Sequence, residues 1–438
     1  MNLRPLSTLI TFLIVGLSFA SARGQALLYE LSSSTEYEFG RYGVSLTGVP
    51  DLDGDGRGDF AIDAYGEASY AGRVHVYSGA TGAELYFIEG THANAFSGWP
   101  VAGVPDLDGD GRGDLLIGEV DGDEVVRVHS GADGAYLYTI VAPNEPFFDL
   151  SIALAGTRDL DGDGAGDIII GAPYEPVPGR GRAGRAYVFS GATGALRFVL
   201  TSPRAEQGGR FGCTVASTPD TNGDGIYDLL VGASAEDSTH RRPGRAYLFS
   251  GADGSLLHHL KSPTPQMNGN FGATLTALHD INGDGRGDLA IAGPTENSSG
   301  AVRSGRVHLF SGRTGRLLYS LDSPNAQTDG AFGATAARTA DLDRDGIDDL
   351  IAATAYEDPP GSPANAGRAY VYSGANGALL YILSSPHEES GGLFGNAVAG
   401  VDDADGDGQG DVLVGAYYEG DGTPGRAYLF SGNQETAD

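Results

Sequence analysis

The 438-residue sequence predicts an all-β fold: a seven-bladed β-propeller of four-stranded antiparallel blades, closed by an N-terminal strand that completes the last blade. Three observations lead to this prediction. An acidic loop recurs seven times, short strand-like runs alternate with turn residues around each loop, and the two ends of the chain carry complementary parts of one repeat. Four-stranded sheets repeated around a central channel form propellers. We expect residues 26–438 to be one such domain.

Residues 1–22 are expected to be a secretory signal peptide, which lies outside the fold. Arg4 supplies a positive start, residues 9–19 an apolar core and residues 20–22 a small-residue cleavage site. A cut after Ala26 is a second possibility. The apolar run is shorter than the ~20 residues of a membrane span. We therefore expect a secreted, extracellular product without membrane insertion.

Cysteine content points to stabilisation by something other than disulfides. The one cysteine, Cys213, cannot pair within the chain, and none follows the expected cleavage site to carry a lipid anchor. We expect Cys213 to be a small buried side chain. Metal ions or core packing must then do what disulfides often do in exported proteins.

The acidic loop is nine residues long and recurs with a period near 60 residues. Its successive starts are separated by 55, 53, 61, 60, 61 and 62 residues. A period that holds through seven copies indicates a repeat architecture. The copies are DLDGDGRGD from Asp51, DLDGDGRGD from Asp106, DLDGDGAGD from Asp159, DTNGDGIYD from Asp220, DINGDGRGD from Asp280, DLDRDGIDD from Asp341 and DADGDGQGD from Asp403.

Each repeat contains four strand-like runs. A Phe-Gly pair such as Phe39-Gly40 or Phe211-Gly212 opens a short segment that leads into the acidic loop, and an apolar run such as 167–173 follows the loop. After a polar stretch come an alternating run, such as 184–191, and a last run, such as 379–383. Runs rich in Val, Ile, Tyr and Phe are typical of strands, and the Asp-Gly and Asn-Gly dipeptides between them are typical of hairpins.

The two ends of the chain predict how the ring closes. The last repeat ends on a third strand at 425–431, and only a polar tail follows it. The N-terminal segment 26–33 matches the fourth-strand segment 378–385 of another repeat. We expect the first mature strand to complete the seventh blade, which removes an exposed sheet edge.

The acidic loops are predicted to bind Ca²⁺, up to seven ions with one in each blade. Side-chain oxygens at positions 1, 3, 5 and 9 and a backbone carbonyl at position 7 suit a hard cation with six to eight oxygen ligands. Mg²⁺ prefers an octahedron with several waters, and transition metals prefer His or Cys, which the loops lack. One copy could be a simple polar turn, but seven in register favour a metal site.

Five residues of each loop are expected to be metal ligands, and the fourth of them acts through its backbone carbonyl. In chain order they are Asp51, Asp53, Asp55, Arg57, Asp59; Asp106, Asp108, Asp110, Arg112, Asp114; Asp159, Asp161, Asp163, Ala165, Asp167; Asp220, Asn222, Asp224, Ile226, Asp228; Asp280, Asn282, Asp284, Arg286, Asp288; Asp341, Asp343, Asp345, Ile347, Asp349; and Asp403, Asp405, Asp407, Gln409, Asp411. We expect the two sites that contain Asn222 and Asn282 to be the weakest.

The loops also explain the net charge of -31. Of the 58 Asp and Glu residues, 26 stand at positions 1, 3, 5 and 9, and the other 32 nearly balance the 27 Lys and Arg. The negative net charge therefore gives little information about the binding partners of the protein. It does predict a destabilised metal-free protein, since Ca²⁺ at ten times each Kd contributes about 1.4 kcal/mol per site, on the order of 10 kcal/mol over seven sites.

Two other recurring motifs are expected to be structural. Arg-Gly-Asp occurs at 57–59, 112–114 and 286–288, where the Asp is already an expected metal ligand, so we do not expect an adhesion ligand. Six repeats also pair a glutamate with an arginine that starts the next strand, which favours a cross-strand ion pair over a catalytic ring. The glutamates are Glu67, Glu175, Glu236, Glu296, Glu357 and Glu419, and the arginines are Arg73, Arg185, Arg245, Arg306, Arg368 and Arg426.

The Phe-Gly and Gly-Ala-Pro segments around a DxDGDGxxD loop resemble the FG-GAP repeats of the integrin α-chain N-terminal propeller. The resemblance covers nearly all of the expected mature chain. It implies calcium in the loops that join strands 1 and 2 on one face, and ligand binding on the opposite face. All seven copies in this sequence carry a metal loop, whereas integrin chains fill only some.

We expect the protein to be an extracellular binding or adhesion module, a monomer whose ligand is an extracellular protein or glycan. A lectin-like carbohydrate binder and an extracellular hydrolase or lyase are the alternatives. The nine His residues form no His-x-x-x-His or His-Glu-x-x-His pattern, which disfavours an enzyme. No basic stripe indicates nucleic acid. Candidate ligand contacts on the opposite face are Tyr65, Tyr70, His92, Trp99, Tyr174, His240, Tyr356, Tyr417 and Tyr418.

Overall fold

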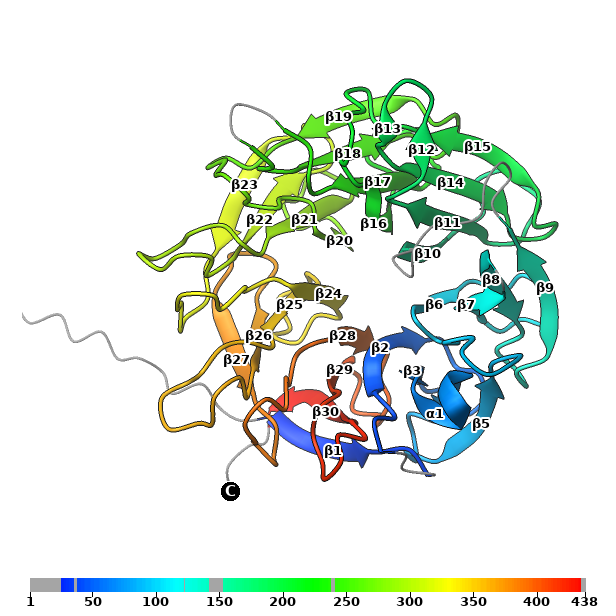
Figure 1. Cartoon of the computed structure of the whole chain (residues 1–438), viewed down its shortest axis with the longest axis vertical. Helices are drawn as coiled ribbons and strands as arrows, with labels where there is room; N and C mark the ends of the chain where they lie inside the picture. The colour runs from blue at the N-terminus through cyan, green and yellow to red at the C-terminus, as the bar shows by residue number, and fades with distance from the viewer. Residues whose placement is uncertain (1–24, 35–37, 122, 142–152, 238–240, 435–438) are drawn as a thin grey trace, which may run out of the picture.

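Each repeat forms a four-stranded antiparallel sheet in the computed structural model, which describes residues 25–34, 38–121, 123–141, 153–237 and 241–434. Seven such sheets surround a central axis as the blades of a propeller (Figure 1). The predicted fold class is therefore confirmed. The predicted signal peptide lies outside the described residues.

The strands of each blade run from the central axis outwards in chain order in blades 1 to 6. Blade 1 contains β2 (Tyr42–Val49), β3 (Asp59–Ala64), β4 (Arg73–Tyr77) and β5 (Glu84–Glu89). Blade 2 contains β6 (Val101–Val104), β7 (Asp114–Asp121), β8 (Asp123–His129) and β9 (Tyr136–Ile140), and blade 3 contains β10 (Ala153–Thr157), β11 (Asp167–Ala172), β14 (Arg185–Ser190) and β15 (Leu196–Leu200). Blade 4 contains β16 (Phe211–Thr218), β17 (Asp228–Ala233), β18 (Arg245–Phe249) and β19 (Leu256–Leu260), and blade 5 contains β20 (Thr274–Leu278), β21 (Asp288–Gly293), β22 (Arg306–Ser311) and β23 (Leu317–Leu321). Blade 6 contains β24 (Thr335–Thr339), β25 (Asp349–Thr354), β26 (Arg368–Tyr372) and β27 (Leu379–Leu383), and blade 7 contains β28 (Val398–Val401), β29 (Asp411–Ala416), β30 (Arg426–Gln434) and β1 (Gln25–Leu31).

In the part of the chain that the structure describes, three small elements lie in the loops between second and third strands. Blade 1 carries α1 (Glu67–Tyr70), a single turn in which Ala68 and Ser69 have left-handed φ values of 52° and 61°. Blade 3 carries the hairpin of β12 (Pro176–Val177) and β13 (Gly181–Arg182). The loops between second and third strands therefore differ in shape from blade to blade, while the four-stranded sheets repeat.

The N-terminal strand closes the ring, as predicted. β1 pairs antiparallel with β30, with Leu31 opposite Ala427, and the sheet order of blade 7 is β1-β30-β29-β28. Figure 1 shows the two ends of the chain side by side in this blade, β1 in blue and β30 in red. Blade 7 thus gains the outer strand that its own repeat lacks.

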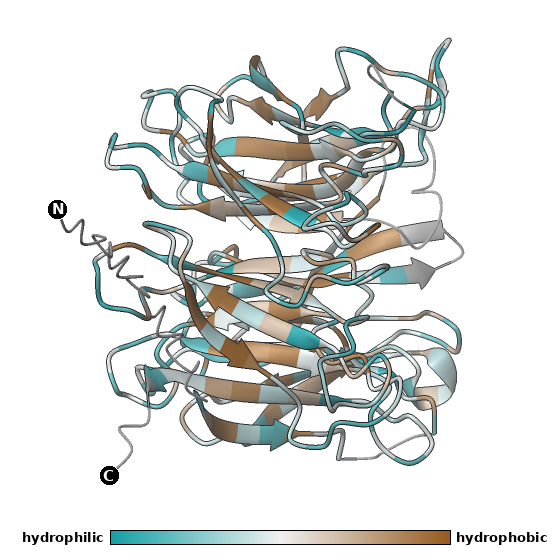
Figure 2. Ribbon diagram, turned by 90° about the vertical axis from the view of Figure 1, so that its left-hand side faces the viewer, coloured by the Kyte–Doolittle hydropathy of each residue, from teal (hydrophilic) through white to brown (hydrophobic). Residues whose placement is uncertain are grey.

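The core lies between neighbouring blades. In six blades every residue of the second strand is buried, as in β11 and β17, because adjacent sheets cover both of its faces. Strands buried on both faces are continuous apolar runs rather than alternating ones, which is the pattern after each acidic loop. Figure 2 shows the apolar residues concentrated in the strands and the polar ones mainly in the loops.

The aromatic residue that opens the repeat packs into this core in blades 1, 4, 5, 6 and 7, and in blade 1 it is Tyr42 rather than Phe39. Phe39 is 45% exposed, whereas Tyr42 is fully buried. Tyr42 lies opposite Ala64 of β3, just as Phe211 lies opposite Ala233 in blade 4. Strand register, and not the local Phe-Gly match, decides which ring is buried.

The recurring glutamate bonds mainly to a ring of the third strand. The predicted ion pair with arginine forms at 3.3–3.6 Å in three repeats, at Glu67–Arg73, Glu175–Arg185 and Glu236–Arg245. In the other three repeats the prediction is wrong, and the arginines pair with other acids: Arg306 with Asp322, Arg368 with Glu388 and Arg426 with Glu30. The constant partner stands two residues further on, on the same face of the strand. These partners are His75 for Glu67, Tyr187 for Glu175, Tyr247 for Glu236, His308 for Glu296, Tyr370 for Glu357 and Tyr428 for Glu419.

Glu419→Gln should remove a pH-dependent loss of stability. Burial raises the pKa of Glu419 to about 6, against the hydrogen bonds from Tyr428 and Ser385 that lower it. Because the folded-state pKa lies above the unfolded value, the contribution of Glu419 to the free energy of unfolding is greatest below pH 4.5. It falls by about 2 kcal/mol as the pH rises to about 6. A Gln side chain stays neutral and still accepts the Tyr428 hydroxyl.

We expect urea denaturation in excess calcium to give equal stabilities at pH 4.5 and a more stable variant at pH 7.5. Glu38→Gln, at an exposed position, is the control and should match the wild type at both pH values. The same pH dependence in Glu419→Gln and wild type would contradict this assignment.

Candidate metal centres

The acidic loops all join the first strand of a blade to its second strand. Because every blade has the same strand order, the seven loops lie on one face of the propeller. Position 9 of each loop is also the first residue of the second strand, as Asp59 is of β3. The loop therefore ends on a residue that the core holds in place.

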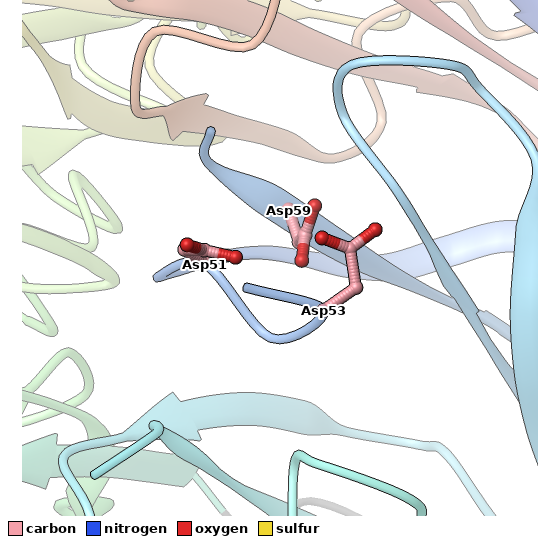
Figure 3. Close-up of side chains that lie close together, drawn as sticks. All are labelled: Asp51, Asp53 and Asp59. Carbon is pink, nitrogen blue, oxygen red and sulfur yellow. The ribbon is translucent and has the colours of Figure 1, made fainter. Parts of the chain in front are cut away.

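Three carboxylates gather in five of the loops. Positions 1, 3 and 9 each offer an oxygen, and these oxygens lie within 4.8 Å of one another. Figure 3 shows one such group, Asp51, Asp53 and Asp59. The same grouping occurs at Asp106, Asp108 and Asp114; Asp159, Asp161 and Asp167; Asp341, Asp343 and Asp349; and Asp403, Asp405 and Asp411. In each group position 9 is buried and position 3 is exposed. An ion held here would be anchored from the core and reached from solvent.

Backbone N–H groups fix these carboxylates. In blade 1, Asp51 Oδ1 accepts from Gly54 at 2.6 Å, and Asp59 Oδ2 accepts from Leu52 at 2.7 Å. Position 5 stands outside the group of three, and its Oδ1 accepts the N–H of position 7, as Asp55 accepts from Arg57 at 2.9 Å. Ligation by position 5 and by the position 7 carbonyl stays a prediction.

The position 9 carboxylates carry raised pKa values. Burial is the main cause, the other carboxylates of the loop add to it, and backbone donors oppose it. The pKa rises to about 6 for Asp114 and Asp288 and to about 7 for Asp349 and Asp411. A cation beside these groups would favour their charged forms. The all-oxygen donor set and its concentrated negative charge fit Ca²⁺.

The two Asn-containing loops are arranged differently from each other. In blade 5, Asn282 Nδ2 donates to both oxygens of Asp288 at 2.8 Å. In blade 4, Asn222 Nδ2 donates instead to Asp224 Oδ2 at 2.9 Å. An amide N–H that faces a carboxylate neutralises no charge and turns a donor towards the expected ligand, which agrees with the expectation of weaker sites.

Two of the Arg-Gly-Asp motifs are engaged in inter-blade ion pairs. Arg57 Nη1 lies 2.9 Å from Asp403 Oδ2, and Arg286 Nη1 lies 2.9 Å from Asp220 Oδ2. Each arginine thus reaches position 1 of the preceding repeat's loop, and the Asp of each motif is fully buried. The Asp of each of these two tripeptides is therefore closed to a partner, while the arginine is about one third exposed.

A cavity of about 400 Å³ lies on the opposite face, at the loops that join strands 2 to 3 and 4 to 1. Its lining residues are Val44, Tyr65, Trp99, Ala334, Thr335, Ala355, Tyr356, Leu393, Gly395, Asn396 and Tyr417. Tyr65 and Trp99 stack with ring centroids 5.2 Å apart. The ring centroids of Tyr417 and Tyr418 lie 4.3 Å apart, and Cζ of Arg41 lies 4.1 Å from the centroid of the Tyr418 ring.

The structure brings together most of the aromatic residues proposed for this face. Tyr65, Trp99, Tyr356 and Tyr417 line the cavity, and Tyr418 packs against it. Tyr70 extends the group through Phe96, whose ring lies 5.8 Å away. Tyr174 lies elsewhere, under Arg210, His92 is not part of the lining, and His240 lies outside the described residues. Sequence reasoning missed Arg41, which gave no signal because it belongs to no repeated motif.

Comparison with known proteins assigns the repeats. The FG-GAP repeat family matches residues 42–77, 152–189, 211–249, 271–310 and 332–372, which fall in blades 1, 3, 4, 5 and 6. Human integrin alpha-IIb is 36% identical over 174 residues, which are 37% of this chain and 16% of that protein. Integrin alpha-5 of Xenopus laevis is 28% identical over 264 residues, 55% of this chain and 25% of that protein.

A protein named for an enzymatic activity is similar as well. Bovine phosphatidylinositol-glycan-specific phospholipase D is 33% identical over 180 residues, 38% of this chain and 21% of that protein. The aligned regions thus span a quarter or less of each of these relatives. Within the described residues, no helix has the length and apolar character to cross a membrane. The chain is an FG-GAP repeat protein whose sequence is similar to parts of integrin α-chains and whose repeats form a seven-bladed propeller.

Proposed function

We propose that this protein is a secreted, monomeric, calcium-binding propeller that acts as an extracellular binding module for a protein or glycan. The acidic loops hold Ca²⁺ on one face and stiffen the blades. The aromatic cavity on the opposite face holds the ligand. The stacked pair of Tyr65 and Trp99 at that cavity is the observation that carries the proposal.

Aromatic rings held by their own packing favour ligand binding. They offer a large contact area at a low cost in side-chain entropy, and such residues dominate binding energy at interfaces. Tyr356 is 50% exposed and Trp99 37%, so their rings are available to a partner. A larger cavity of about 590 Å³ lies on the acidic-loop face, but its lining of Gly, Pro, Ala, Val, Asp and Arg includes no aromatic ring.

The cavity lining favours binding over catalysis. It contains no Asp, Glu, His, Cys or Lys, and its acid–base side chains are the three tyrosines Tyr65, Tyr356 and Tyr417. The similarity to the bovine phospholipase D raises an enzyme as the rival hypothesis. Turnover of a glycan or phospholipid library substrate by the purified protein would favour that rival.

Trp99→Ala should weaken ligand binding at least tenfold. Loss of this ring removes contact area at the centre of the proposed site and one half of the stack with Tyr65, and truncation of such a residue costs about 2 kcal/mol or more. The ligand is first found by screening glycan and matrix-protein arrays with and without calcium. Binding of the hit is then measured by surface plasmon resonance.

Tyr136→Ala is the matched control. Tyr136 is also an exposed aromatic residue, 55% exposed, but it lies on the outer strand β9 of blade 2. Its loss should leave the affinity unchanged. Equal affinities of Trp99→Ala and wild type would place the ligand site elsewhere.

A further inference from the structure

The outermost strand of every blade carries a β-bulge at the same position. In blade 1, Val76 and Tyr77 of β4 lie opposite Tyr86 and Glu84, so Leu85 has no partner of its own. The same step occurs in the other six blades. A bulge redirects the side chain of the extra residue. Six blades place a leucine there, packed on the blade core: Leu28, Leu85, Leu137, Leu257, Leu318 and Leu380.

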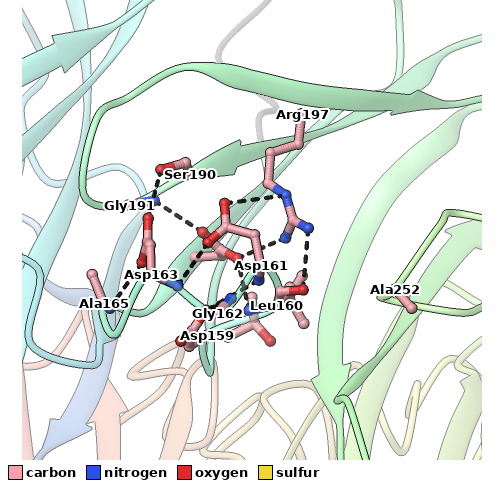
Figure 4. A network of polar contacts seen from close by, with 12 residues as sticks. Asp159, Leu160, Asp161, Gly162, Asp163, Ala165, Ser190, Gly191, Arg197 and Ala252 are labelled. Atoms are coloured by element: carbon pink, nitrogen blue, oxygen red, sulfur yellow. Dashed lines mark hydrogen bonds and ion pairs between the residues drawn. The ribbon is translucent and has the colours of Figure 1, made fainter. Parts of the chain in front are cut away.

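Blade 3 places Arg197 at this position. Its guanidinium reaches the acidic loop of its own blade (Figure 4): Nη1 donates to Asp167 Oδ2 at 2.8 Å, and Nε lies 3.5 Å from Asp161 Oδ2. Nη2 donates to the Leu160 carbonyl at 3.1 Å. The side chain is 16% exposed. One guanidinium therefore contacts the carboxylates of positions 3 and 9 and the backbone carbonyl of position 2.

These are the carboxylates that an ion would need. Positions 3 and 9 are two of the three members of the group that gathers in this loop, Asp159 being the third. The arginines of the neighbouring-blade pairs behave differently, since Arg57 and Arg286 each contact only position 1 of a loop and are about one third exposed. Of these three arginines, Arg197 is the one that contacts two carboxylates of the same loop.

We propose that Arg197 is the resident cation of the third loop, and that this loop binds no Ca²⁺ at concentrations that fill the loops of blades 1, 2, 6 and 7. The guanidinium is permanently charged and offers five donors in a rigid fork. A guanidinium on two of the three carboxylates that would hold the ion places a fixed positive charge beside the site, and its repulsion of a divalent cation opposes Ca²⁺ binding. The third loop is thereby held closed with or without calcium. The inference rests on the proposed calcium binding by the other loops.

Arg197→Leu, which installs the residue of the other six blades, should raise the calcium content by one ion per chain. Bound calcium is measured by equilibrium dialysis and elemental analysis. In EGTA the variant should melt below the wild type, because Asp161 and Asp167 lose their counter-charge, and calcium should restore its melting temperature. An unchanged calcium content overturns the inference.

A second pair of variants tests the wild-type arginine directly. Asp161→Ala, which removes the side-chain oxygen, should leave the calcium content unchanged, whereas the equivalent change in blade 6, Asp343→Ala, should lower it by one ion. Loss of an ion in Asp161→Ala overturns the inference while the proposed function stands. A wild-type protein that binds no calcium at all would refute the proposed calcium binding, and this inference with it.

Discussion

Removal of calcium with EGTA should lower the melting temperature of the mature protein by about 10 °C. Each site filled at ten times its Kd contributes about 1.4 kcal/mol, or about 8 kcal/mol over the six loops other than the third. A chain of this size unfolds with an entropy of about 0.9 kcal/mol per degree. The expected shift follows from the ratio of the two values, and differential scanning calorimetry measures it.

The physical cause is the charge left behind in the loops. Without an ion, position 9 residues such as Asp349 and Asp411 are buried beside other carboxylates, and their pKa values rise to about 7. Titration of calcium back into the protein should restore the original melting temperature, and EGTA already saturated with calcium should have no effect. Superimposable melting curves in calcium and in EGTA would show that the loops are polar turns rather than metal sites.

Deletion of residues 25–31 should abolish the stable monomer. This removes β1, leaves β30 as an open edge and uncovers the cluster in which Leu31 packs against Leu429. It also removes the hydrogen bond of 2.8 Å from the Tyr29 hydroxyl to the Ala80 carbonyl of blade 1. An unpaired edge strand is a template for aggregation. Size-exclusion chromatography should show aggregates in place of the monomer, and a synthetic peptide of residues 25–34 should restore the monomer.

A milder pair of substitutions covers the case in which the deleted chain is insoluble. Leu31 is 6% exposed and Leu27, on the same strand, is 40% exposed. Leu31→Ala should lower the free energy of unfolding by about 3 kcal/mol, as for other buried leucines. Leu27→Ala should lower it by less than about 1 kcal/mol. Equal effects of the two changes in urea denaturation would contradict the closure of blade 7 by β1.

The sequence predicted those features that repeat or that depend on near neighbours in the chain. Seven acidic loops gave seven blades, and the match between 26–33 and 378–385 gave the closure, because strand and turn preferences are local. The prediction was wrong where two nearby residues both fit the repeat pattern. Phe39 and Tyr42 stand three residues apart, and only the pairing of β2 with β3 buries Tyr42.

The side-chain partners depended on contacts that no local pattern contains. The glutamate that follows the second strand in six repeats was expected to pair with an arginine, but the third-strand ring two residues further on lies closer in all six, as Tyr428 does to Glu419. The aromatic cavity likewise draws residues from blades 1, 2, 6 and 7. The repeat places Tyr65 and Tyr417 at one position, directly after the second strand, but only the closed ring brings these two loops to one cavity.

The acidic loops show both sides of this division. By itself the sequence determined where the seven loops stand, and it predicted oxygen ligands for a cation, because a nine-residue loop carries its donors within its own span. Only the tertiary structure decided that positions 1, 3 and 9 meet and that Arg197, 30 residues beyond Asp167, reaches the third loop. A strand bulge sets that reach, since it turns the side chain of one residue towards a loop formed by two other strands.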